Sequence, residues 1–202
     1  LYPHLIMQYN ISPEKIIGVK SSGISVTKLL KQQTPLSHLK TEGACITPNG
    51  AMFKNDNPGF LPRLLEKMYN DRVKFKTLEF QCKQEYQKTK DKELTKKIAT
   101  YHNIQWAKKI SLNSAYGAIG NQYFRYYDVR QATAITTSGQ FVIRFIENKV
   151  NEYMNNILKT HDKVDYIVAS DTDSIYLTLD KLVEVTCKDK PVEHILRFIN
   201  KV

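Results

Sequence analysis

The chain has 202 residues, of which 42% are hydrophobic, and a formal net charge of +10. This composition excludes a disordered chain, and the length suffices for one large or two small domains with a buried core. No apolar run reaches membrane-spanning length, so we expect no membrane partner and no targeting signal. The three cysteines (Cys45, Cys82 and Cys187) and the five histidines lack zinc-ligand spacing, which argues against a zinc protein.

Residues 1–60 are predicted to form mixed, short strands. They contain five of the seven prolines, which interrupt long elements. Pro48, Asn49 and Gly50 separate two short segments, 45–47 and 51–53, that favour extended structure. This pattern predicts a β-hairpin.

Residues 63–116 are predicted to form a helical hairpin. They contain neither Pro nor Gly, and Pro62 and Gly117 flank them as expected for a helix start and a helix end. The polar stretch 87–92 interrupts a helical pattern, which predicts two long antiparallel helices joined by a short turn. The apolar positions are Leu61, Leu65, Met68, Phe75, Leu78, Cys82 and Tyr86, and then Leu94, Ile98, Tyr101 and Ile104.

The basic charge is concentrated in the same region. Residues 63–109 contain 13 Lys and Arg against 6 Asp and Glu. Such a surface binds polyanions in many proteins, although a basic helix face is also compatible with a simple solvated surface.

The last third of the chain is predicted to contain a helix over 132–158, a β-hairpin over 166–179 and a further helix. The helix is marked by an apolar stripe, and the hairpin by two runs rich in β-branched and aromatic residues. The predicted fold class is therefore α+β, with a two-helix insertion. The stripe consists of Ile143, Ile146, Val150, Met154 and Ile157.

Asp171 and Asp173 flank Thr172 at the centre of the predicted β-hairpin. Side chains two residues apart on extended backbone share a face, so we expect two carboxylates close together. Close like charges are unfavourable unless a cation joins them, and Mg²⁺ prefers oxygen ligands of this kind. A solvated turn without a metal is the alternative, because Asp favours turns for backbone reasons.

The helical hairpin carries a second candidate site. Arg72 and Lys76 share a face of the first helix, and Lys109, Asn113 and Tyr116 share a face of the second. If the faces converge, their cations and amide suit a nucleoside triphosphate, and the tyrosine ring suits a base. The alternative is that Arg72 and Lys76 are solubilising residues and that Asn113 is a buried, satisfied amide.

Three motifs, in order, resemble those of family B DNA polymerases. They are Leu1-Tyr2-Pro3, the segment KISLNSAYG at 109–117, and the segment DTDS at 171–174. Further stretches are closer to members from T-even-like bacteriophages: NISPE at 10–14, PNG at 48–50, FRYYD at 124–128 and ATAITT at 132–137. The resemblance covers nearly the whole chain.

The resemblance implies DNA-templated DNA synthesis, in which a primer 3′-oxygen attacks a dNTP with the help of two Mg²⁺ ions. Asp173 and Asp171 match metal-site carboxylates. Arg72 and Lys109 match residues that grip the triphosphate, with Lys76 and Asn113 assisting. The backbone amides of Leu1 and Tyr2 match phosphate-binding groups, the Tyr2 ring matches the steric gate against a ribose 2′-hydroxyl, and Tyr116 matches the tyrosine under the nascent base pair.

The resemblance also implies an architecture. Residues 1–60 would be the first part of a polymerase palm (an antiparallel sheet with packed helices), residues 61–120 the fingers hairpin, and residues 121–202 the second part of the palm. The implied partners are primer-template DNA and dNTP, with a sliding clamp as a further candidate. A phage-encoded polymerase would work in the cytoplasm of the host cell.

The chain departs from the family pattern, for example at His4, which replaces the usual Ser after Leu1-Tyr2-Pro3. The family has a metal-binding aspartate three residues before the position of Leu1, an exonuclease upstream and a thumb downstream, so we expect a fragment that is inactive alone. Ala169 and Ser170 replace the usual Tyr-Gly before the DTDS motif.

The sequence is compatible with three other hypotheses. In these, the chain would be a subunit of a split polymerase, a catalytically dead nucleic-acid-binding module that uses the basic hairpin, or a metal nuclease. The nuclease does not account for Lys109, Asn113 and Tyr116.

Overall fold

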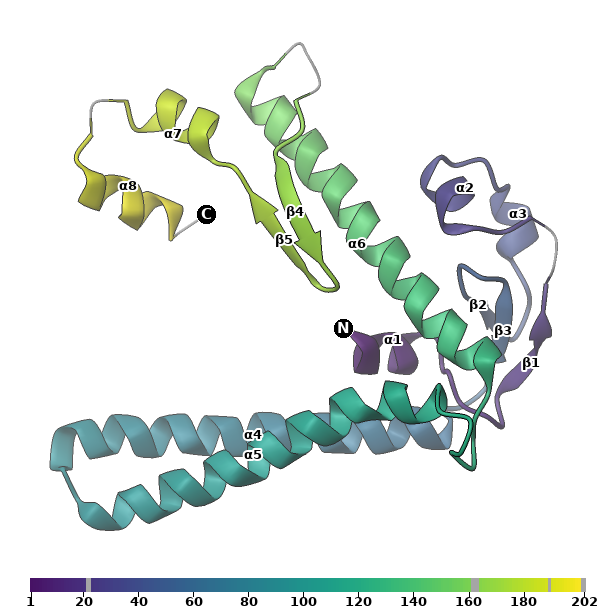
Figure 1. Cartoon of the computed structure of the whole chain (residues 1–202), viewed down its shortest axis with the longest axis horizontal. Helices are drawn as coiled ribbons and strands as arrows, with labels where there is room; N and C mark the ends of the chain where they lie inside the picture. Colours follow the sequence, from purple (N-terminus) through teal and green to yellow (C-terminus); the bar gives the residue numbers. More distant parts are fainter. Residues whose placement is uncertain (21–22, 161–163, 189, 201–202) are drawn as a thin grey trace. The chain divides into compact units, whose positions relative to one another are not determined.

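The chain divides into two units, residues 1–139 and residues 140–202. The computed structural model describes residues 1–20, 23–160, 164–188 and 190–200. The first unit contains α1 (Tyr2–Gln8), β1 (Ile16–Val19), α2 (Val26–Leu30), α3 (Leu36–Leu39), β2 (Ala44–Ile46), β3 (Ala51–Lys54), α4 (Phe60–Thr89) and α5 (Lys92–Ile119). The boundary between the units falls within α6 (Val129–Leu158) (Figure 1).

A small antiparallel sheet follows α1, with the strand order β1-β3-β2. The predicted hairpin over 45–53 is confirmed, because β2 pairs with β3 through Cys45 opposite Phe53. Gly50 turns the chain with a φ of +83°, and a Cβ at this position would lie 2.4 Å from the carbonyl oxygen of Lys20. The turn therefore requires glycine for both its backbone conformation and its close packing.

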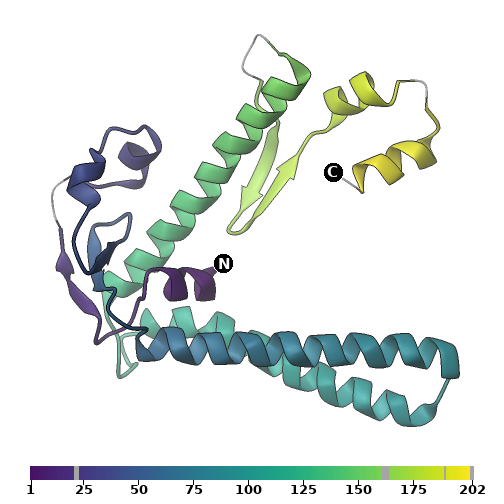
Figure 2. The ribbon, with the colours of Figure 1, turned by 180° about the vertical axis from the view of Figure 1, so that it is seen from behind.

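The predicted helical hairpin is also present. Helices α4 and α5 run side by side as a long antiparallel pair (Figures 1 and 2). The turn falls inside the predicted stretch: Lys90 has a left-handed φ of 57°, and the Asp91 side chain caps α5 by accepting a bond from the Glu93 N–H. The prediction that Gly117 follows the second helix is wrong, because α5 continues through it to Ile119. A single glycine weakens a helix only modestly, and here packing at the end of α5 outweighs that preference.

The core of the first unit lies where the helical hairpin meets the sheet. Leu65 of α4, Leu112 and Ile119 of α5, Phe53 of β3 and Ile135 of α6 are all buried in one cluster. Towards the turn the two helices have mainly each other to pack against. There Phe75 contacts Tyr101, with 6.0 Å between ring centres.

Side chains from residues 10–14 cap the start of α4. The Asn10 Oδ1 accepts a hydrogen bond from the Gly59 N–H (2.7 Å), and the Glu14 Oε1 accepts one from the Phe60 N–H (2.7 Å). The Ser12 Oγ accepts a longer bond from the Leu61 N–H (3.4 Å). The first N–H groups of a helix have no partner within the helix, so these long-range bonds fix where α4 begins.

The second unit contains the rest of α6, the hairpin of β4 (Ile167–Asp171) and β5 (Ser174–Leu177), α7 (Asp180–Thr186) and α8 (Val192–Ile199). The predicted helix, β-hairpin and following helix are thus present, although α6 begins at Val129 rather than at residue 132. Met154, Tyr166 and Leu182 form a small buried cluster. Of the predicted apolar stripe, Met154 is buried, whereas Ile146 and Ile157 are exposed.

The fold is a mixture of helices with small antiparallel sheets, as the α+β prediction requires. The domain boundaries at residues 60 and 120, between the palm and fingers segments, remain a prediction. Within the described parts of the chain, none of the helices is both long enough and apolar enough to span a membrane.

The cap of α4 leads to a stability prediction for Gly59. A Cβ at Gly59 would lie 2.5 Å from the Ser12 Cβ and 2.9 Å from its Oγ, so Gly59→Ala must displace the capping side chain. We expect a loss of about 1–3 kcal/mol in the free energy of unfolding, measured by urea denaturation. Gly18→Ala is the matched control, because a Cβ there meets nothing within 4 Å. Equal losses in the two variants would contradict the role of Ser12.

Candidate functional site

Arg72 and Lys109 lie at the same level of the α4–α5 hairpin. The residues just before them, Asp71 and Lys108, form an ion pair across the two helices with 3.0 Å between Oδ2 and Nζ. The Arg72 side chain is half-buried, and its Nε is buried without a hydrogen-bond partner among the residues described. A buried donor without an acceptor is unfavourable, so an anionic oxygen bound at this level would be stabilising.

Lys76 and Asn113 are both exposed on the same hairpin. The exposure of Asn113 excludes the alternative of a buried, satisfied amide. The exposure of Lys76 is compatible both with a solubilising role and with ligand binding. That these two residues converge on one ligand with Arg72 and Lys109 remains a prediction.

The structure brings together two tyrosines that were predicted separately. Tyr2 begins α1 and Tyr116 lies near the end of α5, and their ring centres are 4.7 Å apart at an interplanar angle of 31°. Both pack against the core of the first unit. Gly139 lies close by, since a Cβ there would be 3.4 Å from the Tyr2 Cε1. Tyr2 is thus confined on two sides, and Leu1 precedes it as the N-cap of α1.

A polar and aromatic cluster further along the hairpin was missed in the sequence. Glu79 of α4 is only 6% exposed, and its Oε1 lies 2.6 Å from the Lys83 Nζ and 3.1 Å from the His102 Nδ1. The His102 ring stacks on Trp106 (6.1 Å between ring centres, 17° between planes). The Lys109 Nζ lies 4.7 Å from the centre of the Trp106 ring.

The sequence contained a signal for this cluster. Lys109, Asn113 and Tyr116 are spaced by four and three residues, and the same spacing continued backwards reaches Trp106 and His102. These five positions therefore share one helix face. The contribution of Glu79 carried no such signal, because it depends on the register between the two helices.

Asp171 and Asp173 occupy the turn between β4 and β5, as predicted. Asp171 is the last residue of β4 and pairs with Ser174, whereas Asp173 belongs to the turn itself. Thr172 has a φ of 43°, so the backbone between the two aspartates is not extended. The argument that extended backbone places both side chains on one face is therefore wrong for this pair. Their proximity remains a prediction.

Both aspartates are exposed, and their local bonds stabilise the turn. The Asp173 N–H donates to the Asp171 carbonyl oxygen (2.5 Å), and the Thr172 hydroxyl donates to the Asp171 Oδ1 (3.0 Å). Among the described residues, no group of three or more His, Cys, Asp or Glu side chains is arranged to hold a metal ion. The aspartates offer only oxygen ligands, which suits Mg²⁺, but two carboxylates form only part of a coordination shell.

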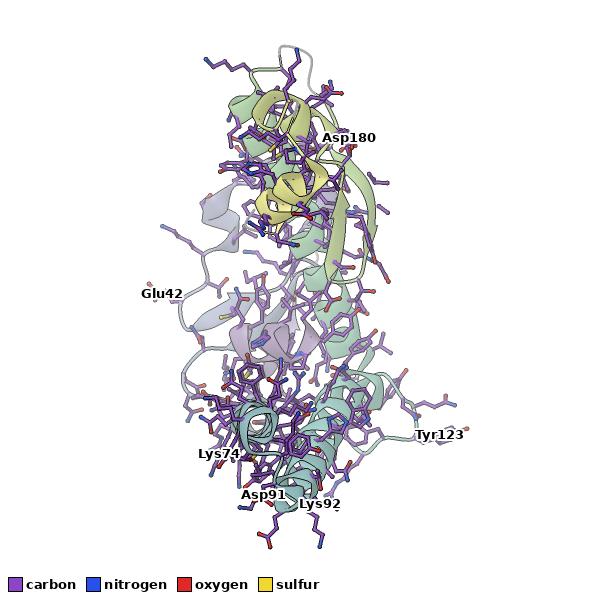
Figure 3. The ribbon with its side chains drawn as sticks, turned by 90° about the vertical axis from the view of Figure 1, so that its left-hand side faces the viewer. Glu42, Lys74, Asp91, Lys92, Tyr123 and Asp180 are labelled. Carbon is purple, nitrogen blue, oxygen red and sulfur yellow. The ribbon has the colours of Figure 1, made fainter. Side chains whose placement is uncertain are left out.

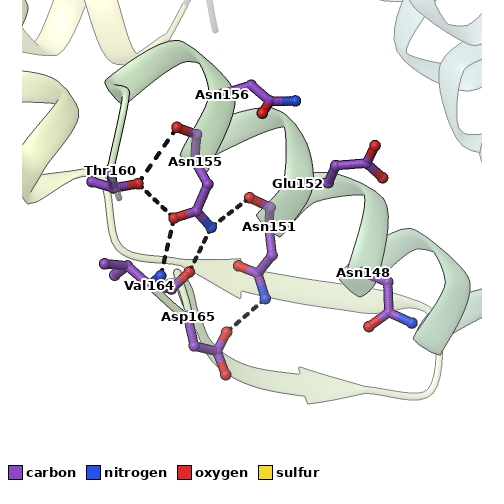
Figure 4. A pocket seen from close by; sticks show the side chains of 8 residues that line it. All are labelled: Asn148, Asn151, Glu152, Asn155, Asn156, Thr160, Val164 and Asp165. Carbon is purple, nitrogen blue, oxygen red and sulfur yellow. Dashed lines mark hydrogen bonds between the residues drawn. The ribbon is translucent and has the colours of Figure 1, made fainter. Parts of the chain in front are cut away.

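A pocket of about 680 Å³ lies beside the end of α6 in the second unit. The Asn155 Oδ1 accepts bonds from the Val164 N–H (3.0 Å) and the Thr160 hydroxyl (2.5 Å), and Asn151 donates to Asp165 (2.8 Å) (Figure 4). These amides are engaged in joining α6 to the residues that precede β4. The pocket is thus explained by local structure and gives no functional assignment.

The connection from α5 to α6 is rich in aromatic residues. Tyr123 is 87% exposed and points away from the rest of the chain near it (Figure 3). Tyr126 instead contacts Phe60 at the start of α4, with 5.2 Å between ring centres, and the Arg125 guanidinium lies 5.7 Å from the centre of the Tyr126 ring. The segment FRYYD therefore helps to join the two ends of the helical hairpin.

The sequence profile of DNA polymerase family B matches residues 1–201. The chain therefore belongs to DNA polymerase family B. The DNA-directed DNA polymerases of Escherichia phage RB69 and Enterobacteria phage T4 are 30% and 32% identical to it, in alignments that cover 100% of this chain. These matches confirm the resemblance found in the motifs.

The chain covers 26% of the RB69 protein and 27% of the T4 protein, so it spans about a quarter of the length of these relatives. The family B DNA polymerase from the hyperthermophilic archaeon Pyrobaculum calidifontis has a similar fold, with a TM-score of 0.53 at 22% identity. That likeness covers 94% of this chain and 21% of the archaeal chain.

The buried carboxylate of Glu79 gives a pH-dependent prediction. The hydrogen bond from Lys83 lowers the pKa of the Glu79 carboxyl; burial opposes this effect, His102 adds to it, and the balance lies below the ordinary value of 4.5. A lowered folded-state pKa stabilises the fold above the unfolded pKa, and this contribution is lost as the pH falls through the folded pKa. We expect Glu79→Gln to lower the free energy of unfolding at pH 7 by about 1 kcal/mol.

Denaturation of wild type and Glu79→Gln at pH 7 and at pH 3 measures this effect. The difference between the two proteins should shrink at the lower pH, because the wild-type carboxyl is then increasingly protonated. Glu85→Gln, an exposed site on the same helix, is the control. A difference that does not depend on pH would rule out a role for the charge of Glu79.

Proposed function

We propose that this chain contributes the nucleotide-binding hairpin and part of the metal-binding site of a DNA-directed DNA polymerase. The observation that carries the proposal is the buried Nε of Arg72, at the level of Lys109 on a strongly basic helical hairpin. Membership of family B supports the reaction, which joins a dNTP to the 3′-hydroxyl of a primer paired with template DNA.

In this proposal the incoming triphosphate binds at the level of Arg72 and Lys109. The planar guanidinium donates to phosphate oxygens through its fork, and the ammonium offsets their charge. Lys76 and Asn113, both exposed, assist from one turn on either side of this level, because α4 and α5 run antiparallel. The Asp71–Lys108 ion pair is already complete, so Lys108 serves to hold the helices together.

The two tyrosines are assigned to the sugar and the base. Tyr2, packed between Tyr116 and Gly139, has little room to move aside, which suits a steric gate against a 2′-hydroxyl. Tyr116 would lie under the nascent base pair. The backbone amides of Leu1 and Tyr2 would bind the phosphates.

Asp171 and Asp173 would hold two Mg²⁺ ions, together with further oxygen ligands. When bound, such ions lower the pKa of the primer hydroxyl and stabilise the pyrophosphate leaving group. The carboxylates themselves bind and orient. Because two carboxylates form an incomplete site, we expect the 202 residues to be inactive without the rest of the polymerase.

The remaining assignments follow from the family pattern. They are a palm formed by residues 1–60 and 121–202, a fingers hairpin formed by residues 61–120, and exonuclease and thumb segments elsewhere in the full-length protein. Primer-template DNA is the proposed partner, and a sliding clamp is a further candidate. The proposed location is the cytoplasm of a host cell infected by a phage.

The first test concerns Lys109 in the full-length protein. We expect Lys109→Met to raise the apparent KM for dNTP about tenfold or more in primer extension, because a charged contact with the triphosphate is lost. Affinity for primer-template DNA should change little. Lys74→Met, at an exposed position on α4, is the control for the lost positive charge. An unchanged KM would count against the proposed triphosphate site.

The second test concerns Asp173. We expect Asp173→Asn to lower the rate of primer extension by on the order of a thousandfold, because a metal ligand loses its charge. Primer-template binding without metal should remain. Glu184→Gln, at an exposed position in the second unit, is the control. If the wild-type protein bound DNA but did not extend a primer with Mg²⁺ and dNTP, a catalytically dead binding module would be the better description.

A further inference from the structure

Trp106 is the only tryptophan in the chain, and this residue of α5 is 48% exposed. The buried positions of α5 are Leu94, Gln105, Leu112 and Ile119, so Trp106 is not part of its buried face. A large indole ring at such a position contributes less to the core than a buried one. Its contacts therefore call for another explanation.

The Trp106 ring contacts two side chains of the same helix, His102 and Lys109. His102 stacks on Trp106 at 6.1 Å, and the Lys109 ammonium lies 4.7 Å from the centre of the Trp106 ring. Indole is the most favourable aromatic partner for a cation at this distance. The ring thus links an imidazole one turn before it with an ammonium one turn after it.

The network is anchored in the other helix by Glu79. Its buried carboxylate can only accept, so the 3.1 Å contact places a proton on the His102 Nδ1, which donates to it. Lys83, four residues along α4, holds the same carboxylate oxygen at 2.6 Å. The orientation of the His102 ring, and with it that of Trp106, is therefore supported from α4 as well as from α5.

We propose that Trp106 is a positioning residue for Lys109. Its face holds the ammonium at the level of Arg72 before the nucleotide arrives. This inference rests on the proposed function, in which Lys109 binds the triphosphate. A lysine side chain has four flexible bonds, and restricting them beforehand reduces the conformational entropy lost on binding.

The contact with the ring does not compete with the phosphate. An ammonium group has three N–H donors and the ring occupies one side of it, so donors remain for phosphate oxygens. A paired carboxylate would have to be displaced by the incoming anion. Trp106 therefore increases the affinity for dNTP rather than reducing it.

The test is a double-mutant cycle in the full-length protein with Trp106→Leu, Lys109→Met and the double variant. A cation–π contact at a partly exposed site predicts that Trp106→Leu raises the apparent KM for dNTP about two- to fivefold, with kcat little changed. Trp106→Phe, which keeps an aromatic face, should retain most of the wild-type affinity for dNTP. In the Lys109→Met background, Trp106→Leu should have no further effect. Phe80→Leu, which removes another exposed aromatic ring of the hairpin, is the matched control and should leave KM unchanged.

The outcomes separate the two hypotheses. If Lys109→Met raises KM but Trp106→Leu leaves it unchanged or lowers it, the positioning role is overturned and the triphosphate site stands. Equal effects of Trp106→Leu with and without Lys109 would also overturn it, because the ring would then act by another route. If Lys109→Met itself has no effect, the proposed function fails, and the inference fails with it.

Discussion

The helical hairpin depends on how the start of α4 is held by the side chains of Asn10, Ser12 and Glu14. Asn10 makes three long-range hydrogen bonds, since its Nδ2 also donates to the carbonyl oxygens of Lys54 and Asn57. Burial raises the pKa of the Glu14 carboxyl, but the bonds from Ser12 and Phe60 lower it, and the balance lies below the ordinary value. Glu14 is thus ionised at neutral pH, which strengthens it as a cap.

The position of the start of α4 matters because the candidate site lies far along a long helix. Helix α4 has 30 residues, which corresponds to about 45 Å, and Arg72 lies about 18 Å from its start. A small change in the direction or starting residue of α4 would rotate or displace every side chain further along. Asn10, Ser12 and Glu14 fix the direction and the starting residue of α4. The Asp71–Lys108 ion pair then helps to keep the register between α4 and α5 near the candidate site.

The helices and strands were predictable from local sequence patterns, whereas the long-range contacts that connect them were not. Helical periodicity and the polar stretch at 87–92 were enough to find the hairpin and its turn. The helix through Gly117 was missed because burial around Ile119 outweighs the local preference of one glycine. The caps of α4 join residues separated by more than 40 positions, and no local pattern contains such a pairing. For the candidate site, helical spacing placed Lys109, Asn113 and Tyr116 on one face, but the left-handed Thr172 and the contact from Glu79 required the folded chain.

Two adjacent lysines show how the hairpin divides its positive charge. The Lys108 ammonium has a carboxylate partner, and to bind an anion it would have to exchange one strong interaction for another. The Lys109 ammonium lies over a neutral ring, which orients it but leaves its charge uncompensated by that partner. A structural lysine benefits from the first arrangement and a ligand-binding lysine from the second. The chemical nature of the partner therefore distinguishes two neighbouring lysines: Lys108 is paired with a carboxylate of the other helix, whereas Lys109, in the proposed function, binds a phosphate.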